Sequence, residues 1–265
     1  MKKYLSFFKL RLNIALQYRA AAIGGMFTQF FWAIMQILVF QAFYKVVISD
    51  NISLEQLISY VWLKQAFYTI ISASIDSEIR TTIEKGNISY ELCRPTHIYW
   101  MWFFKILANK IAGGFLKAIP ILLIAPFLPA GLALQMPAGI GEFILFVISL
   151  LLSTCLMAAI MNAFYISIFY TMSSKGIGSI FYAVLEFFGG TFVPIAIMPK
   201  FLQTICYILP FGLAADLPFR IYSGSIAIND AIIYIIMQIL WIAILTITGT
   251  IITNQRLKKI VIQGG

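Results

Sequence analysis

Long apolar runs, separated by short polar segments, dominate the pattern of residues along the chain. An α-helix rises about 1.5 Å per residue, so roughly 20 apolar residues cross the ~30 Å hydrocarbon core of a bilayer. The runs lack the period-two alternation of a transmembrane β-strand. The pattern therefore predicts an all-α integral membrane protein with six transmembrane helices, at about residues 20–44, 56–75, 111–130, 142–170, 177–198 and 229–252.

The fifth run is interrupted by glycine and proline where a straight helix would continue. Each proline removes an amide donor and clashes with the preceding turn, so the backbone must bend here. Within hydrocarbon, irregular backbone persists only where protein or water satisfies its polar groups. We therefore predict an external re-entrant segment over residues 199–228, between helices 5 and 6, with a gate that hinges at Gly189, Gly190, Pro194, Pro199 and Pro210.

The composition excludes a soluble globular protein, because 61% of the 265 residues are apolar and only 11% are charged. The net charge of +9 comes from bases that indicate topology rather than a nucleic-acid-binding face. Bases without acids precede the first run, so the positive-inside rule places both ends of a six-span chain in the cytoplasm. The same orientation assigns Lys105 and Lys110 to cytoplasmic segments, and Asp216 and Arg220 to external ones.

Two polar segments lie on the predicted cytoplasmic side of a single domain that covers residues 1–265. Residues 1–19 have apolar side chains at helical spacing, which predicts an interfacial amphipathic helix, either a basic membrane anchor or a contact for a partner. Residues 76–99 predict a short helix that ends near Lys85, with Gly86 at its C-terminal cap. This segment is either a solvated connecting loop or a docking knob.

Three ionisable residues lie inside apolar runs: Lys64, Lys117 and Glu186. An unpaired charge at the bilayer centre costs roughly 2.5–3.5 kcal/mol on insertion scales, so each should face a partner or water. For Glu186, two interpretations stay open, a polar point on a substrate path or between subunits, and a structural ion pair.

Sequence motifs for enzyme chemistry are absent from the chain. There is no GxxxxGK[ST] phosphate loop, no HExxH and no GxSxG, and His97 is the single histidine. The three cysteines, Cys93, Cys155 and Cys206, show no CxxC spacing. We therefore expect no catalytic residue, no metal site and no cofactor in this chain.

The order of these features resembles the permease subunits of ABC-2 type exporters, in the short six-span branch without a large external domain. The resemblance rests on six spans with both ends inside, on GNISYELCRPTHIYW at residues 86–100, on the block at residues 189–224, and on the tail that ends Gln263-Gly264-Gly265. It covers essentially the whole chain.

The resemblance implies a division of labour between subunits. It implies an N-terminal interfacial helix at 4–19, a re-entrant hairpin at 199–224, and a coupling helix at about Ser77 to Leu92 that presses into a separate ATP-binding subunit, which would bind ATP and Mg²⁺. It also implies a second permease, as a homodimer or heterodimer, in a bacterial cell membrane. The matching positions of the coupling motif are Glu84, Gly86, Asn87, Leu92, Arg94 and Pro95.

The expected function is therefore the outward movement of an amphipathic or hydrophobic substrate, such as a drug, a peptide or a lipid-like molecule. We expect contact with membrane lipid and no nucleic acid. Two alternatives remain open: a secondary transporter or channel driven by an ion gradient, with Glu186 and Lys117 as ion-linked groups, and a structural or immunity subunit that acts by contact alone.

Overall fold

The computed structural model describes residues 2–17, 19–46, 52–88, 91, 93, 95–171 and 173–257. Every regular element in these ranges is a helix, which confirms the predicted all-α class. The long helices are α2 (Arg19–Tyr44), α7 (Ile98–Ile124), α8 (Ile140–Thr171) and α13 (Ile228–Leu257). The short elements are α1 (Lys2–Leu16), α3 (Leu54–Ala66), α4 (Tyr68–Ile71), α5 (Ser77–Glu84), η1 (Ala125–Phe127), α9 (Lys175–Phe188), η2 (Ile195–Ile197), α10 (Lys200–Ile208), α11 (Pro210–Ala215) and α12 (Leu217–Tyr222).

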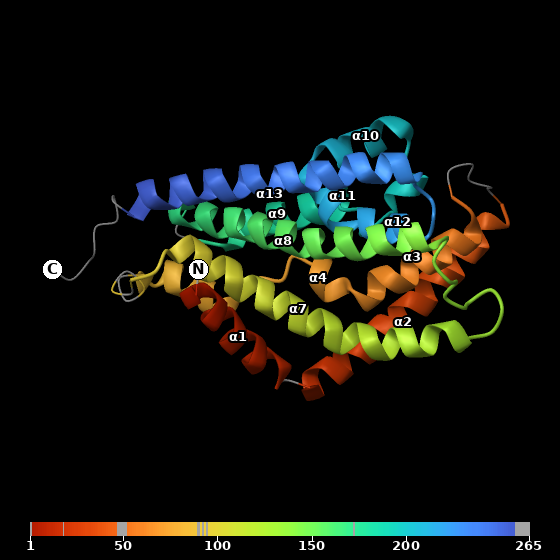
Figure 1. Cartoon of the computed structure of the whole chain (residues 1–265), viewed down its shortest axis with the longest axis horizontal. Coiled ribbons are helices and arrows are strands. Elements are labelled where there is room, and N and C mark those ends of the chain that lie inside the picture. Colours follow the sequence, from red (N-terminus) through yellow and green to blue (C-terminus); the bar gives the residue numbers. More distant parts are fainter. Residues whose placement is uncertain are drawn as a thin grey trace.

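The long helices run along the long axis of the molecule (Figure 1). Helix α8 packs against both α13 and α7, while α2 and α1 pack against α7. The start of α1 and the end of α13 lie toward the same end of the bundle, which we call the terminal end, and α10 to α12 lie toward the opposite end (Figure 1).

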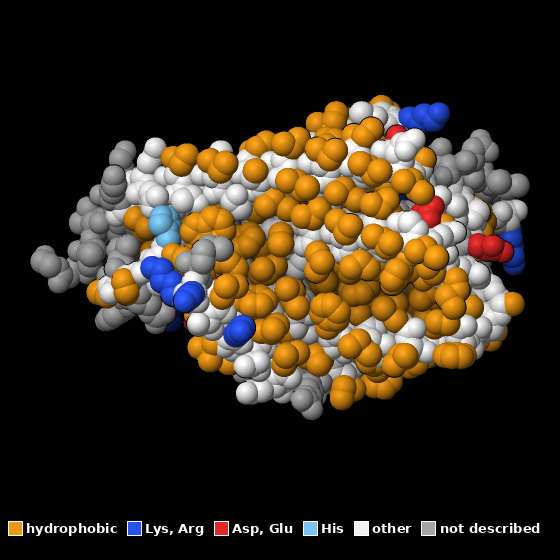
Figure 2. All heavy atoms as spheres, viewed as in Figure 1, with side chains coloured by type: hydrophobic (Ala, Val, Ile, Leu, Met, Phe, Trp, Pro, Cys, Tyr) orange, Lys and Arg blue, Asp and Glu red, His pale blue; other side chains and the backbone are white. Residues whose placement is uncertain are grey.

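Four helices in the described ranges are long and apolar enough to cross a membrane, namely those at Ala22–Tyr44, Ile98–Phe127, Ile140–Thr171 and Ile228–Leu257. Figure 2 shows hydrophobic side chains across the middle of one face, with charged side chains toward the ends of the long axis. Many of these exposed apolar side chains belong to α2, α7, α8 and α13. Such a belt is typical of a surface that contacts lipid.

The predicted second crossing, at 56–75, is broken into α3 and α4 at Phe67. The ring of Phe67 packs between those of Phe146 and Phe219, and the segment ends at Ile71 instead of 75. The ammonium of Lys110 explains that end, because it donates hydrogen bonds to the carbonyls of Ile70 (2.9 Å) and Ser72 (2.8 Å). It thus caps carbonyls that a continuing helix would have satisfied.

The predicted limits of the third crossing are also wrong. Helix α7 begins at Ile98 rather than near 111, so Lys105 and Lys110 lie within a helix instead of in a connecting segment. Both side chains are buried against neighbouring helices. The search for apolar runs missed residues 98–110 because Lys105 and Lys110 interrupt the run. The charges of these two lysines find partners only through tertiary contacts.

The predicted fifth crossing, at 177–198, is shorter in the structure, where α9 ends at Phe188. The chain then turns through Gly189 and Gly190, and Gly190 has a φ of 70°. A side chain on Gly190 would meet Ile195 at 2.7 Å, so both the backbone angle and the space require glycine. The prolines that follow begin short helices rather than ending them: Pro194 precedes η2, Pro199 precedes α10 and Pro210 is the first residue of α11.

Helices α11 and α12 are buried inside the bundle, packed against α8 with α3 and α13 on either side. Side chains of α13 bond the neighbouring backbone carbonyls of α11 and α10. Gln238 of α13 donates to the carbonyl of Leu213 (2.8 Å) and to Ser153 of α8 (3.0 Å), and Trp241 donates to the carbonyl of Ile208 (3.0 Å). The apolar sequence of 210–222 therefore belongs to the core of the protein.

Candidate functional site

Two groups of polar side chains, one at each end of the bundle, are candidates for function. We call the first the α5 anchor; it comprises Arg11, Asp76, Glu78, Glu84 and Lys105. We call the second the Asp216 network; it comprises Tyr60, Lys64, Tyr207, Asp216 and Arg220. Each group joins helices that are far apart in the sequence.

Asp76 begins helix α5 as its N-cap. Its Oδ1 accepts hydrogen bonds from the backbone N–H groups of Glu78 (2.9 Å) and Ile79 (3.1 Å), which would otherwise lack partners in the first turn. The N–H of Asp76 itself donates to the hydroxyl of Tyr165 on α8, at 2.6 Å. The start of α5 is therefore fixed to a long helix of the bundle.

Lys105 joins the first turn of α5 to α7. Its Nζ lies 3.0 Å from Oδ1 of Asp76 and 2.7 Å from Oε2 of Glu78. Arg11 of α1 donates from both terminal nitrogens to the two carboxylate oxygens of Glu78, at 3.0 and 3.2 Å. Partial burial alone raises the pKa of Glu78, but the hydrogen bonds and charges of Lys105 and Arg11 outweigh it and lower the pKa to about 2. This carboxylate is a charged link between α1, α5 and α7.

The other end of α5 contacts the start of α9. Oε1 of Glu84 accepts a hydrogen bond from the backbone N–H of Ser174, at 2.8 Å. The hydrogen bonds from Ser174 lower the pKa of Glu84, and the charges of Arg80 and Lys175 act in the same direction. As predicted, the helix ends near Lys85, and Gly86 follows with a φ of 71°.

The remaining residues of the predicted coupling motif make fewer contacts. Asn87 and Pro95 are exposed, and Lys3 of α1 donates to the carbonyl of Pro95. Nearby, the N–H of His97 donates to the hydroxyl of Tyr4, at 2.9 Å. Leu92 and Arg94 lie outside the described residues.

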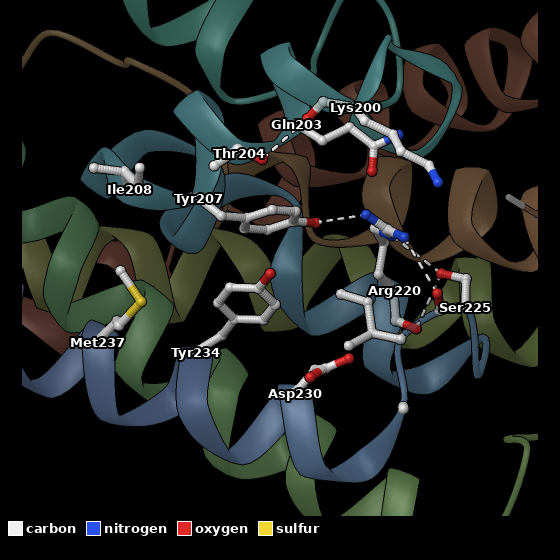
Figure 3. Close-up of a pocket in the computed structure, with 12 residues that line it drawn as sticks. Lys200, Gln203, Thr204, Tyr207, Ile208, Arg220, Ser225, Asp230, Tyr234 and Met237 are labelled. Carbon is white, nitrogen blue, oxygen red and sulfur yellow. Dashed lines mark hydrogen bonds between the residues drawn. The ribbon is translucent and has the colours of Figure 1, made fainter.

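The Asp216 network alternates cations, phenols and one carboxylate. Each oxygen of Asp216 accepts a hydrogen bond from a phenol, Oδ1 from Tyr60 and Oδ2 from Tyr207 (Figure 3 shows Tyr207). Lys64 donates to the hydroxyl of Tyr60 (3.1 Å), and Arg220 donates to that of Tyr207 (3.0 Å). Each phenol thus donates to the carboxylate and accepts from a cation, which satisfies charged groups that are almost wholly buried.

Three of the predicted residues meet at the inner edge of this network. The ammonium of Lys64 donates to the carbonyl of Gly190, in the turn after α9. Glu186 is buried and interacts electrostatically with Lys64, while its Oε1 has no hydrogen-bond partner among the described residues. Lys117 lies elsewhere, against Gly25 of α2.

Sequence reasoning missed the centre of the network because it assigned Asp216 and Arg220 to an external segment. Both side chains are buried, which the assignment to one side of the membrane did not predict. The insertion cost that identified Glu186 applies equally to an aspartate in the apolar sequence Leu213-Ala214-Ala215-Asp216-Leu217. It would have found Asp216 if the segment had been treated as protein interior.

A family model described as ABC-2 family transporter protein matches residues 26–264. The chain belongs to the ABC-2 transporter family. This match confirms the resemblance drawn from the sequence, and membership implies a permease subunit of an ABC transporter that partners an ABC ATP-binding protein. A search of curated proteins gave no significant match.

Proposed function

We propose that the chain is the membrane-spanning permease of an ATP-driven exporter, powered by a separate ATP-binding subunit that docks on α5. In this proposal the terminal end of the bundle faces the cytoplasm of a bacterial cell, and the end with α10 to α12 faces outside. The substrate is amphipathic or hydrophobic, a drug, a peptide or a lipid-like molecule, and moves outward. A second permease, identical or different, completes the path.

The observation that carries this proposal is that both ends of α5 are bound to other helices of the bundle. Its first turn is bound to α1, α7 and α8, and its last turn is bound to the start of α9 through Glu84. A force applied to α5 by a partner therefore acts directly on α9.

Helix α9 continues this route to the opposite end of the bundle. It ends at Gly189 and Gly190, and the carbonyl of Gly190 is held by Lys64 of the Asp216 network. The contacts thus form a continuous physical route from the docking helix to the proposed gate, along which movement of one could bias the other. Gly190, in its left-handed conformation, is the proposed hinge.

Six crossings remain part of the proposal. Helices α3 and α9 contain 13 and 14 residues, so each spans about 20 Å of the ~30 Å hydrocarbon core. The remaining depth would be covered by α4 on one side and by the turn and η2 on the other. Both irregular pieces pack against other helices, where irregular backbone is tolerated within a membrane.

The decisive experiment reconstitutes the chain with its ATP-binding partner and measures substrate-stimulated ATP hydrolysis. Glu84→Lys reverses the charge that holds Ser174, so stimulation should fall severalfold while membrane insertion is unchanged. Glu55→Lys is the matched control, because Glu55 is an exposed acid at the start of α3. Normal stimulation in Glu84→Lys would contradict the assignment of α5 as the coupling helix.

Transport assays separate this proposal from the ion-driven alternative, which the buried pair of Lys64 and Glu186 keeps relevant. An exporter of the proposed kind stops when the catalytic residue of the ATP-binding subunit is replaced. Transport that survives this replacement, but stops when a protonophore is added, would instead show an ion-driven carrier.

A further inference from the structure

A pocket of about 400 Å³ lies beside the Asp216 network, between α10, the segment before α13 and α13 itself (Figure 3). The polar side chains that line it are those of Lys200, Gln203, Thr204, Tyr207, Arg220, Ser225, Asp230 and Tyr234. Figure 3 shows Lys200 and Arg220 on the same side of the pocket, with Asp230 and Tyr234 on the α13 side. The pocket plays no part in the coupling route described above.

Arg220 brings a buried positive charge to this pocket, because only 6% of its surface is exposed. Its Nη1 donates to Tyr207 (3.0 Å), its Nε to Oγ of Ser225 (3.2 Å) and its Nη2 to the carbonyl of Ser225 (3.2 Å). A guanidinium has five N–H donors, so these bonds leave two donors unused. Among the described residues, no carboxylate lies within ion-pair distance of Arg220.

Neither acid near this charge forms a direct ion pair with Arg220, although Asp216 attracts it through space. Asp216 does not line the pocket, and each of its oxygens already accepts a hydrogen bond from a phenol. Asp230 lines the pocket but is exposed in the first turn of α13. Lys200, also exposed, adds a second positive charge. The pocket lining therefore has two cations and one acid, which favours an anion, and a fork-shaped guanidinium suits a phosphate or carboxylate.

Apolar surface adjoins this charged centre. Ile208, Ile226 and Met237 line the pocket, and Phe201 and Ile205 of α10 are exposed beside it. A small hydrophilic anion would leave this surface uncovered, whereas an anion with a hydrocarbon part would cover it.

We propose that this pocket binds the anionic head group of an amphipathic molecule, a phosphate or carboxylate held by Arg220 and Lys200, with its apolar part along α10 and α13. The ligand is either a lipid of the surrounding membrane or another amphiphile of the same chemistry. The proposal does not depend on the function proposed above, because binding needs neither the ATP-binding subunit nor transport.

The test uses the full chain in nanodiscs that contain equal amounts of phosphatidylglycerol and phosphatidylcholine, followed by native mass spectrometry of the lipids retained on release. The natural protein should retain phosphatidylglycerol in preference. Lys200→Glu should reduce that preference roughly tenfold, the size of about 1.4 kcal/mol of lost charge-assisted binding. The side chain of Lys200 is exposed, so this variant should fold normally.

Lys45→Glu is the matched control, because Lys45 is an exposed lysine just after α2 and outside the pocket. Equal retention of both lipids by the natural protein, or an equal loss in Lys45→Glu and Lys200→Glu, would overturn the proposal. Arg220→Lys keeps the positive charge but lacks the paired N–H donors of a guanidinium. Its preference for phosphatidylglycerol should therefore lie between those of the natural protein and Lys200→Glu.

Competition identifies the part of the ligand that the pocket recognises. A soluble decyl phosphate should displace phosphatidylglycerol, whereas the same concentration of inorganic phosphate should not. If inorganic phosphate displaced phosphatidylglycerol as well as decyl phosphate does, the role assigned to the apolar surface would be wrong. Displacement by decyl phosphate would show that a free amphiphile of this chemistry binds as well as a membrane lipid.

Discussion

The α5 anchor and the Asp216 network use similar residues under opposite conditions. In the anchor, cations and carboxylates meet directly, and although Lys105 is buried, the side chain of Glu78 is 61% exposed. In the network, Asp216 is fully buried and is separated from both cations by phenols. Exposed pairs are weak and respond to salt and pH, whereas a buried charge that loses its partners is strongly destabilising. The anchor is therefore suited to reversible contact, and the network to holding α11 and α12 in place.

The largest expected effect tests the buried side of this comparison. Asp216→Ala leaves the buried cations Lys64 and Arg220 without the carboxylate that balances them, so the free energy of unfolding should fall by about 3–5 kcal/mol. Thermal unfolding in detergent and the yield of monodisperse protein measure this loss. Asp230→Ala, which removes an exposed aspartate, should have little effect. Equal stability of the two variants would show that the network does not hold this region together.

A second prediction concerns the hinge that the network contacts. Gly190→Ala places a side chain at a φ of 70°, within 2.7 Å of Ile195, and should destabilise the fold by about 2 kcal/mol. Gly176→Ala is the control in α9, because a side chain there would meet no atom within 4 Å. Unfolding of the two variants under the same conditions compares them. A harmless Gly190→Ala would remove the physical basis for the hinge.

A third prediction tests the anchor. Lys105→Met removes the ammonium that contacts both Asp76 and Glu78, and should destabilise by about 1–2 kcal/mol. Because Arg11 and the N-cap bonds remain, α5 should become more mobile without the protein unfolding. Hydrogen exchange of the α5 amides measures this change, with Lys85→Met, an exposed lysine after the same helix, as the control. Unchanged exchange in Lys105→Met would mean that Lys105 does not anchor α5.

The smallest expected effect is the pH dependence of the anchor. Because the folded pKa of Glu78 is about 2, below its ordinary 4.5, its stabilising effect is full above pH 4.5 and is lost as the pH falls through 2. The contribution should stay below about 1 kcal/mol, since the carboxylate is largely exposed. Unfolding curves of Glu78→Gln should show a weaker pH dependence than the natural protein over this range. A pH dependence in Glu78→Gln equal to that of the natural protein would contradict this role of Glu78.

The presence of helices and the positions at which they end could be predicted from local sequence. The apolar runs gave helices, residues 77–84 formed the predicted short helix with Gly86 after it, and the chain turned at Gly189 and Gly190. These features depend on residues close together in sequence. The lengths of the second and fifth runs were wrong. The packing of Phe67, the cap by Lys110 and the contact of Lys64 with Gly190 all join residues far apart in the sequence.

Only part of the candidate site could be predicted from the sequence. Lys64 and Glu186 were identified by the cost of burying a charge, and Glu84 by resemblance. The sequence by itself determined that the chain is a helical membrane protein with charges where lipid would reject them. Only the tertiary structure decided which groups pair, because Asp216 meets Tyr60, and through it Lys64, across more than 150 residues of chain. Hydrophobicity is a property of each residue, whereas satisfying a buried charge depends on its neighbours in space.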